Sequence, residues 1–145
     1  MASERTASGT WGGGWVCDVE VGDFTLRVDE PESVPGGTNT GPQPTDLLLA
    51  SVASCFTLAL SFAASKRSID LEHLDVDVIG MYDGPSFREI RIMAYVGCDV
   101  AELDRLVATA ERVCYVTNTL RNGVDLVIEA TATERSAAGR GLNRT

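Results

Sequence analysis

Basic residues and histidine are scarce in this chain. It has 12 Lys and Arg against 21 Asp and Glu, a net charge of −9, and a single histidine in 145 residues. Binding to nucleic acid needs a basic surface that neutralises phosphates, and this composition offers none. We therefore expect no nucleic-acid partner, and ligands that are small, neutral or apolar.

Closely spaced cysteine motifs are also missing. The four cysteines include no CxxC pair, and His73 is distant in sequence from all of them. A zinc site is therefore not expected, and four cysteines are too few for a disulfide scaffold. We expect neither a bound metal nor a bound cofactor.

The N-terminus lacks the apolar stretch of a secretory signal. Residues 1–10 are predicted to be a flexible leader and residues 135–145 a disordered polar tail. The one long apolar run, 47–64, is interrupted by serine, threonine and cysteine, which favours a core helix over a membrane span. We expect a single domain over 11–134 in a cytoplasmic, reducing compartment where cysteines stay free or cycle.

Period-two and helical patterns divide the first half of the domain into three parts. Alternation over 15–21 and 24–28 predicts a β-hairpin. Residues 31–44 carry four prolines and three glycines and are predicted to form a long loop. Proline and aspartate at the start, and lysine and arginine at the end, predict a helix over 44–67. This helix is apolar on nearly every side, so we expect it to be central and buried.

The second half begins with two strands. Alternation predicts strands over 74–78 and 90–98, with a turn at 83–85. Helical spacing follows over 101–114, and a last strand is predicted over 124–129. The resulting order is β-β-α-β-β-α-β, which indicates an α+β fold with a long central buried helix.

Two of the cysteines occupy the inward edges of the predicted helices. Cys55 lies within the long apolar helix, and Cys114 closes the apolar stripe of the second. Two such thiols are what a two-cysteine redox site needs, in which one attacks and the other resolves. A buried structural thiol is the alternative for Cys55, because free cysteine is among the most buried residue types. Cys17 and Cys98 lie on apolar strand faces and are expected in the core.

Two segments carry a resemblance to a known family. Residues 41–55, GPQPTDLLLASVASC, and residues 110–120, AERVCYVTNTL, resemble the first-cysteine and second-cysteine motifs of the OsmC/Ohr family, the osmotically induced and organic hydroperoxide resistance proteins. The resemblance spans roughly residues 10–134. It implies an intertwined homodimer with two sites at the subunit interface. It also implies that Cys55 reduces organic hydroperoxides, that Cys114 forms a disulfide with it, and that an external dithiol, such as dihydrolipoyl groups on a carrier protein, restores both.

The sequence departs from the peroxidatic members of that family at two places. Those members carry a glutamate at the position of Thr45 and an arginine in the region of 12–14. Here the acidic residue is Asp46, one position later, and residues 12–14 are glycines. A branch of the family that is less clearly peroxidatic also places its acidic residue at the position of Asp46.

Candidate supporting residues follow from the needs of Cys55. Burial raises the pKa of a thiol, so a cation or several donors must reach its sulfur. Arg27 could do so across a dimer, or could be a solvated strand arginine. Ser51, one turn earlier, could donate to a thiolate or simply allow close helix packing. Thr45 is expected to be the helix N-cap, and Asp46, on the opposite helix face from Cys55, a helix-start charge or a partner for an arginine at the mouth of the site.

We therefore predict a two-cysteine organic hydroperoxide reductase with peroxiredoxin-type, antioxidant activity. The apolar neighbours of Cys55 favour alkyl or lipid hydroperoxides over hydrogen peroxide. One alternative is a non-peroxidatic dimer of the same fold that binds a small apolar or thiol ligand, which the missing arginine and glutamate favour. Another is a structural, stress-associated dimer.

Overall fold

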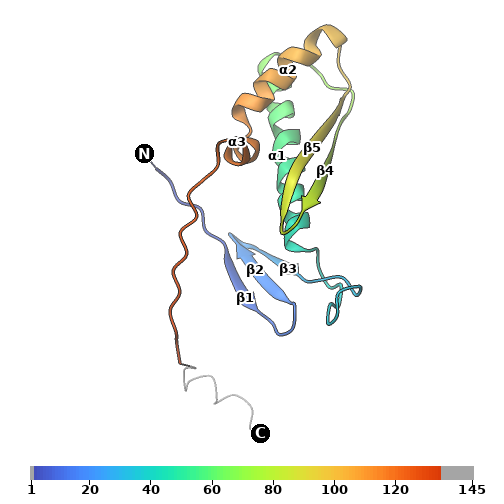
Figure 1. The fold of residues 1–145 in the computed structure, drawn as a ribbon. Coiled ribbons are helices and arrows are strands. Elements are labelled where there is room, and N and C mark those ends of the chain that lie inside the picture. The colour runs from blue at the N-terminus through green and yellow to red at the C-terminus, as the bar shows by residue number, and fades with distance from the viewer. Residues whose placement is uncertain (1, 135–145) are drawn as a thin grey trace.

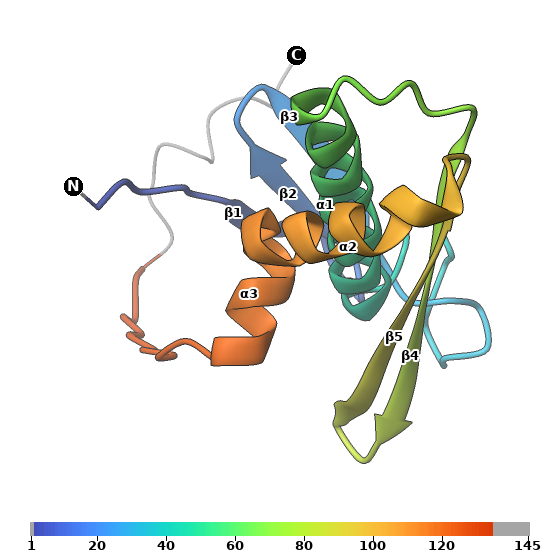
Figure 2. The same cartoon turned by 90° about the horizontal axis from the view of Figure 1, so that it is seen from above.

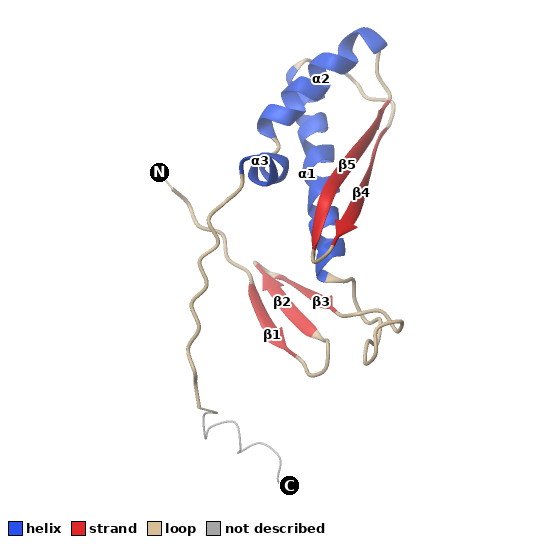
Figure 3. Cartoon of the chain, in the orientation of Figure 1, coloured by secondary structure: helices blue, strands red, loops and turns tan. Residues whose placement is uncertain are grey.

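The computed structural model describes residues 2–134. These residues form two antiparallel sheets and three helices (Figures 1 and 3). In chain order the elements are β1 (Ser8–Trp11), β2 (Cys17–Val21), β3 (Phe24–Val28), α1 (Pro44–Lys66), β4 (Leu74–Asp83), β5 (Ser86–Val96), α2 (Val100–Val113) and α3 (Tyr115–Asn122). The predicted disordered tail over 135–145 lies outside the described residues.

The N-terminal sheet contains the predicted hairpin and one additional strand. β2 and β3 pair antiparallel across the turn at 22–23, as the alternation predicted. β1 pairs with the other edge of β2, so the prediction of a flexible leader over 1–10 is wrong for residues 8–10. The turn between β1 and β2 works because Gly13 and Gly14 adopt positive φ values of 96° and 54°, which favour glycine.

The loop over 29–43 is held in place by a buried carboxylate. Asp29 is 1% exposed, and its oxygens accept hydrogen bonds from the hydroxyl groups of Thr38 and Thr40 and from the backbone N–H groups of Glu30 and Thr40. These donors, the Thr38 hydroxyl first, hold the pKa of Asp29 far below its usual range. The long proline-rich loop is therefore fixed to the end of β3.

Helix α1 runs over Pro44–Lys66 and confirms the predicted bounds. Its N-cap, however, is Gln43 and not Thr45, because proline suits the first helical position and the cap must precede it. Asp46 closes a capping box by accepting the backbone N–H of Gln43 at 3.1 Å. The prediction of Asp46 as a helix-start charge is confirmed.

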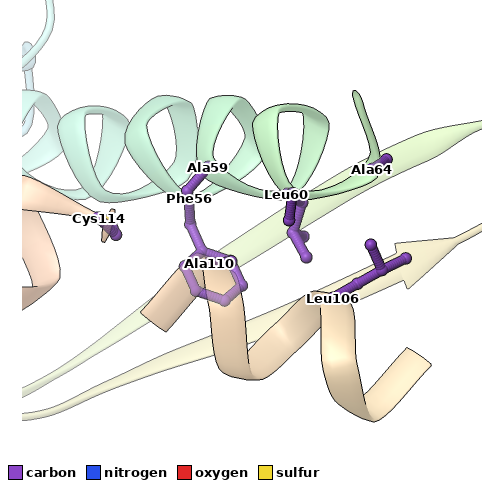
Figure 4. Close-up of a cluster of buried hydrophobic side chains, with 8 residues drawn as sticks. Phe56, Ala59, Leu60, Ala64, Leu106, Ala110 and Cys114 are labelled. Atoms are coloured by element: carbon purple, nitrogen blue, oxygen red, sulfur yellow. The ribbon is translucent and has the colours of Figure 1, made fainter. Parts of the chain in front are cut away.

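One face of α1 forms the core of the chain. It packs against α2 and β4, as Figures 2 and 4 show. The buried residues of this core cluster come from α1 and from the α2–α3 region, and they are Phe56, Ala59, Leu60, Ala63, Ala64, Leu106, Ala110 and Cys114. The other face of α1 is open, with Leu58 69% exposed. The expectation of a central buried helix therefore holds for one face of α1 in a single chain, because the other elements of that chain cover only that face.

α1 is also long and apolar enough to cross a membrane by length and composition, and in the described chain no other helix is. Its packing against α2 and β4 makes it a core helix. It lies well inside the chain, so it is not an N-terminal signal.

β4 and β5 form the second predicted hairpin, with longer strands than the alternation alone indicated. α2 begins at an Asp99 cap, whose carboxylate accepts the N–H of Ala101 at 2.9 Å. It ends one residue earlier than predicted, because Cys114 adopts an extended backbone with φ −75° and ψ 104°. The chain then enters α3, a separate helix that the sequence pattern did not predict (Figure 2).

The predicted last strand over 124–129 is absent from the described chain. Residues 124–134 form neither helix nor strand, and Ile128 is 91% exposed. A strand needs a neighbouring edge with free N–H and C=O groups, and this segment pairs with neither of the two sheets. The observed order is therefore β-β-β-α-β-β-α-α, still an α+β fold.

Candidate active site

The structure brings Cys55 and Cys114 together from two different elements. Cys55 lies in the middle of α1, and Cys114 lies at the junction of α2 and α3. Their Sγ atoms are 3.3 Å apart, and both thiols are free. A disulfide has an S–S length of about 2.05 Å, so only a small movement separates this arrangement from a bond. Cys114 is completely enclosed, whereas Cys55 is partly exposed.

The buried stripe of α2 explains how Cys114 reaches α1. Leu106, Ala110 and Cys114 follow one another at four-residue spacing and are all completely buried, which places them on one helical face. Figure 4 shows this face turned toward α1. The sharp change of direction at Cys114 then brings the first N–H groups of α3 to the two sulfurs.

The surroundings of Cys55 raise its pKa. Burial is the largest cause, because a low-dielectric environment disfavours the charged thiolate. The negative charge that Cys114 can carry acts in the same direction. Backbone N–H groups of Val116 and Tyr115 oppose these effects only in part. Cys55 is therefore a weaker acid than an ordinary cysteine.

The surroundings of Cys114 lower its pKa. Burial raises it, but hydrogen bonds to the side chain and backbone N–H of Thr117, to the Cys55 thiol and to the backbone N–H of Val116 together outweigh that effect. Thr117 is 8% exposed, and its hydroxyl donates to the Cys114 carbonyl at 3.3 Å. The Cys114 thiol donates a hydrogen bond to the Cys55 sulfur at 3.3 Å.

Arg27 has a partner within its own sheet. Its guanidinium donates two hydrogen bonds, of 2.8 and 2.9 Å, to the carboxylate of Asp18, which lies directly opposite on β2. This pairing lowers the pKa of Asp18 and raises that of Arg27. In the described chain the guanidinium is thus directed at Asp18, on the solvated face of the strand.

The other expected supporting residues act elsewhere. The Ser51 hydroxyl donates to the carbonyl of Leu48 at 2.7 Å, so of the two alternatives for Ser51 the hydrogen bond to the Cys55 thiolate is not formed in the described chain. Such back-bonding within a helix is common for serine. Thr45 shares a hydrogen bond of 2.6 Å with the Tyr82 hydroxyl, which ties the tip of the β4–β5 hairpin to the start of α1.

Thr117 is the site residue that the sequence reading missed. A signal was available, because Thr117 follows Cys114 by three positions in the segment Cys-Tyr-Val-Thr. The side chain of the third helical residue lies close to the N-cap residue of the same helix. Cys17 and Cys98 are half-buried, and Cys98 packs against the core as expected.

Comparison with known proteins places this arrangement in a family. Residues 37–129, well over half of the chain, match the family described as OsmC-like protein. The chain belongs to the OsmC-like family. The resemblance seen in the two cysteine segments is thereby confirmed.

Relatives and solved structures agree with this assignment. The organic hydroperoxide resistance protein of Xanthomonas axonopodis pv. citri is 32% identical over 108 residues, covering 70% of this chain and 75% of its own length. An uncharacterised protein of Haloferax volcanii is 31% identical over 113 residues, covering 75% and 81%.

Among solved structures, an OsmC-like protein from Mycoplasma pneumoniae aligns with a TM-score of 0.73 at 18% identity, covering 83% of this chain and 89% of its own. An organic hydroperoxide resistance protein OsmC from Legionella pneumophila aligns with a TM-score of 0.63 at 25% identity, covering 86% and 94%. The OsmC-like fold is therefore confirmed.

Proposed function

We propose that this protein is a thiol-dependent peroxidase that reduces organic hydroperoxides. The Cys55 thiolate attacks the distal peroxide oxygen, the O–O bond breaks, and the alkoxide leaves and is protonated to an alcohol. Cys55 is then a sulfenic acid, and the Cys114 sulfur attacks it to form a disulfide and release water. An external dithiol, such as a dihydrolipoyl carrier in a reducing cytoplasm, restores both thiols.

The 3.3 Å separation of the two sulfurs is the observation that carries this proposal. The difference in exposure suits the two roles, because the attacking sulfur must meet a peroxide and the resolving sulfur need meet only its partner. Cys55 is partly exposed and Cys114 is enclosed. The named Xanthomonas relative supports the choice of organic hydroperoxides as substrates.

The working form in this proposal is an intertwined homodimer. Large apolar side chains are exposed on the N-terminal sheet, on the open face of α1 and along residues 124–128. Exposed apolar surface spread over several elements is typical of a chain that is completed by another. Light scattering should give twice 15.5 kDa; a monomer at micromolar concentration would contradict the dimer.

Peroxide consumption tests the chemistry directly. With cumene hydroperoxide and a dithiol, the wild type should turn over, Cys55→Ser should be inactive, and the half-buried control Cys17→Ser should keep its rate. Mild oxidation followed by mass spectrometry should identify a Cys55–Cys114 link. A main link that involves Cys17 or Cys98 would contradict the assignment.

A second candidate is a non-peroxidatic dimer that binds a small apolar or thiol ligand. A cavity of about 260 Å³ favours it; its lining is mostly apolar and consists of Val52, Ile90, Ile92, Thr117, Leu120 and Arg121. In the described chain, moreover, the Arg27 guanidinium is engaged by Asp18 and not by Cys55. Saturable binding of octanethiol by calorimetry, together with no hydroperoxide consumption, would favour this candidate over the peroxidase.

A further inference from the structure

The two cysteines differ in how their sulfurs can be reached. Cys114 has no exposed surface and belongs to the buried cluster between α1 and α2 (Figure 4). Cys55 is partly exposed, because it lies at the edge of the open face of α1, beside the exposed Ser54 and one turn before Leu58. An assembly that keeps this fold can only add cover to Cys114. Reagents from solvent therefore meet the Cys55 sulfur.

Cys114 is also fixed in place through its backbone. Its N–H donates to the Ala110 carbonyl at 2.9 Å, and its carbonyl accepts the N–H of Asn118 at 3.0 Å. The Thr117 hydroxyl donates to the same carbonyl at 3.3 Å. The backbone at Cys114 is thus bonded to α2 on one side and to α3 on the other. The 3.3 Å gap to Cys55 is short enough to close through side-chain rotation, so Cys114 stays beside Cys55 when the bond forms and when it opens.

We propose that the reductant of the Cys55–Cys114 disulfide attacks the Cys55 sulfur alone, and that Cys114 is always the leaving group and prevents monothiols from completing the reduction. This inference deepens the proposed function and rests on it. The course of thiol–disulfide exchange depends on which sulfur can be reached. An attack on Cys114 would have to come through the buried cluster that encloses it. An attack on Cys55 uses the side on which the hydroperoxide already reaches that sulfur.

The reduction takes two exchange steps. One thiolate of the dithiol attacks the Cys55 sulfur, a new S–S bond forms, and the Cys55–Cys114 bond breaks. The Cys114 sulfur leaves with the electron pair and takes up a proton, which balances the proton lost by the attacking thiol. The second thiolate of the reductant then attacks the reductant's own sulfur, and Cys55 leaves and is protonated. Two protein sulfurs are reduced, and the dithiol becomes a cyclic disulfide.

A monothiol such as glutathione should stop after the first of these steps. It forms a mixed disulfide with Cys55 while the Cys114 sulfur is still held beside it. Attack by Cys114 is intramolecular, so it outruns attack by a second glutathione from solution. The Cys55–Cys114 bond then forms again and the monothiol is expelled. A dithiol avoids this reversal, because its second thiol is also held beside the mixed disulfide.

The reactivity of each thiol alone tests access. In a protein with Cys17→Ala and Cys98→Ala, Cys114→Ser leaves Cys55 as the sole thiol, and Cys55→Ser leaves Cys114. Glutathione disulfide should modify the Cys55 protein at least about tenfold faster than the Cys114 protein, since an enclosed group reacts only through local opening of the structure. In urea both proteins should react at similar rates, which controls for the intrinsic reactivity of the two thiols. Similar rates in the folded proteins would overturn the proposal.

A trapping experiment keeps both reactive cysteines and needs no peroxide. The protein with Cys17→Ala and Cys98→Ala is oxidised with diamide, exposed to glutathione, quenched with acid and mapped by mass spectrometry. Glutathione should be found on Cys55, as a minor species beside the Cys55–Cys114 disulfide, whereas dithiothreitol at equal thiol concentration should reduce the pair completely. Glutathione on Cys114, or its stable accumulation on Cys55, would overturn the proposal.

Hydroperoxide turnover of the same protein separates this inference from the proposed function. The Cys55 adduct in a protein that turns over hydroperoxide supports both. The same adduct in a protein that consumes no hydroperoxide would reject the proposed peroxidase, while the order of exchange stands. Glutathione on Cys114 in a protein that turns over hydroperoxide would overturn the order of exchange alone.

Discussion

The N-terminal sheet (β1–β3) and the helical body (α1–α3 with β4 and β5) differ in how far their apolar side chains are buried within one chain. In the body, α1 and α2 enclose a cluster in which Leu60 and Leu106 have no exposed surface. In the sheet, β1 is exposed along its whole length, and Phe24 is 75% exposed. In both regions apolar side chains recur at the spacing of a strand or a helix. Only in the helical body does another element of the same chain pack on those side chains.

This difference indicates where the chain is complete by itself and where it is not. A sheet or helix with an apolar face needs another element packed on that face. The body meets that need on one face of α1, the face that positions the two cysteines, so their contact is a property of one chain. The sheet does not meet it within residues 2–134, which supports the proposed second copy as its cover.

The largest expected effect lies in the body. Leu106→Ala removes a fully enclosed side chain between α2 and α1 and should lower the free energy of unfolding by about 2–5 kcal/mol. Urea unfolding followed by circular dichroism measures it. The control Val100→Ala, at the exposed start of α2, should change stability by less than about 0.5 kcal/mol. A Leu106→Ala effect as small as that would remove the contrast between the two regions.

The next effect should appear in association. If a second copy covers the N-terminal sheet, Phe24→Ser loses roughly 1.5–3 kcal/mol of apolar burial, which weakens the dimer about 10-fold to 100-fold. Sedimentation at several protein concentrations measures the shift. Asp23→Ser introduces the same residue at the neighbouring turn position and should leave the dimer unchanged. The same dimer affinity in both variants would show that the sheet lies outside the interface.

A smaller effect concerns the loop that joins the two regions. The pKa of Asp29 is lower in the folded chain than in the unfolded chain, so its network contributes stability above the unfolded value of about 4 and loses it as pH falls below. Asp29→Asn should lower the melting temperature at pH 7 and flatten its decline below pH 4. Asp23→Asn is the control, because Asp23 is exposed. Parallel curves for wild type and Asp29→Asn would refute the role of the network.

The smallest effect lies where the β4–β5 hairpin meets α1. Tyr82→Phe removes one partner of the 2.6 Å hydrogen bond with Thr45 and should cost about 0.5–1.5 kcal/mol, toward the lower value because both groups are near solvent. Thr45→Val should cost a similar amount. In the double variant the two losses should not add, since they remove the same bond. Fully additive losses would show that the contact does not contribute to stability.

Local patterns in the sequence were sufficient for much of the fold. Proline, aspartate and lysine at their preferred helix ends predicted the bounds of α1, and period-two alternation predicted β2, β3 and the β4–β5 hairpin. The apolar stripe of α2 placed Cys114 on an inward face. These features depend on residues within a few positions of one another, so they can be read without knowing what packs against them.

Local sequence patterns were enough to predict α1, α2, both hairpins and the two cysteine segments that carry the family resemblance. The environment of the two sulfurs depends on tertiary packing. The contact of Cys114 with Cys55 and the pairing of Arg27 with Asp18 both depend on where separate segments meet. The missing strand over 124–129 follows the same rule. Apolar and polar residues do alternate over this segment. A β-strand, however, forms only where another strand lies beside it, and the tertiary structure determines whether one does.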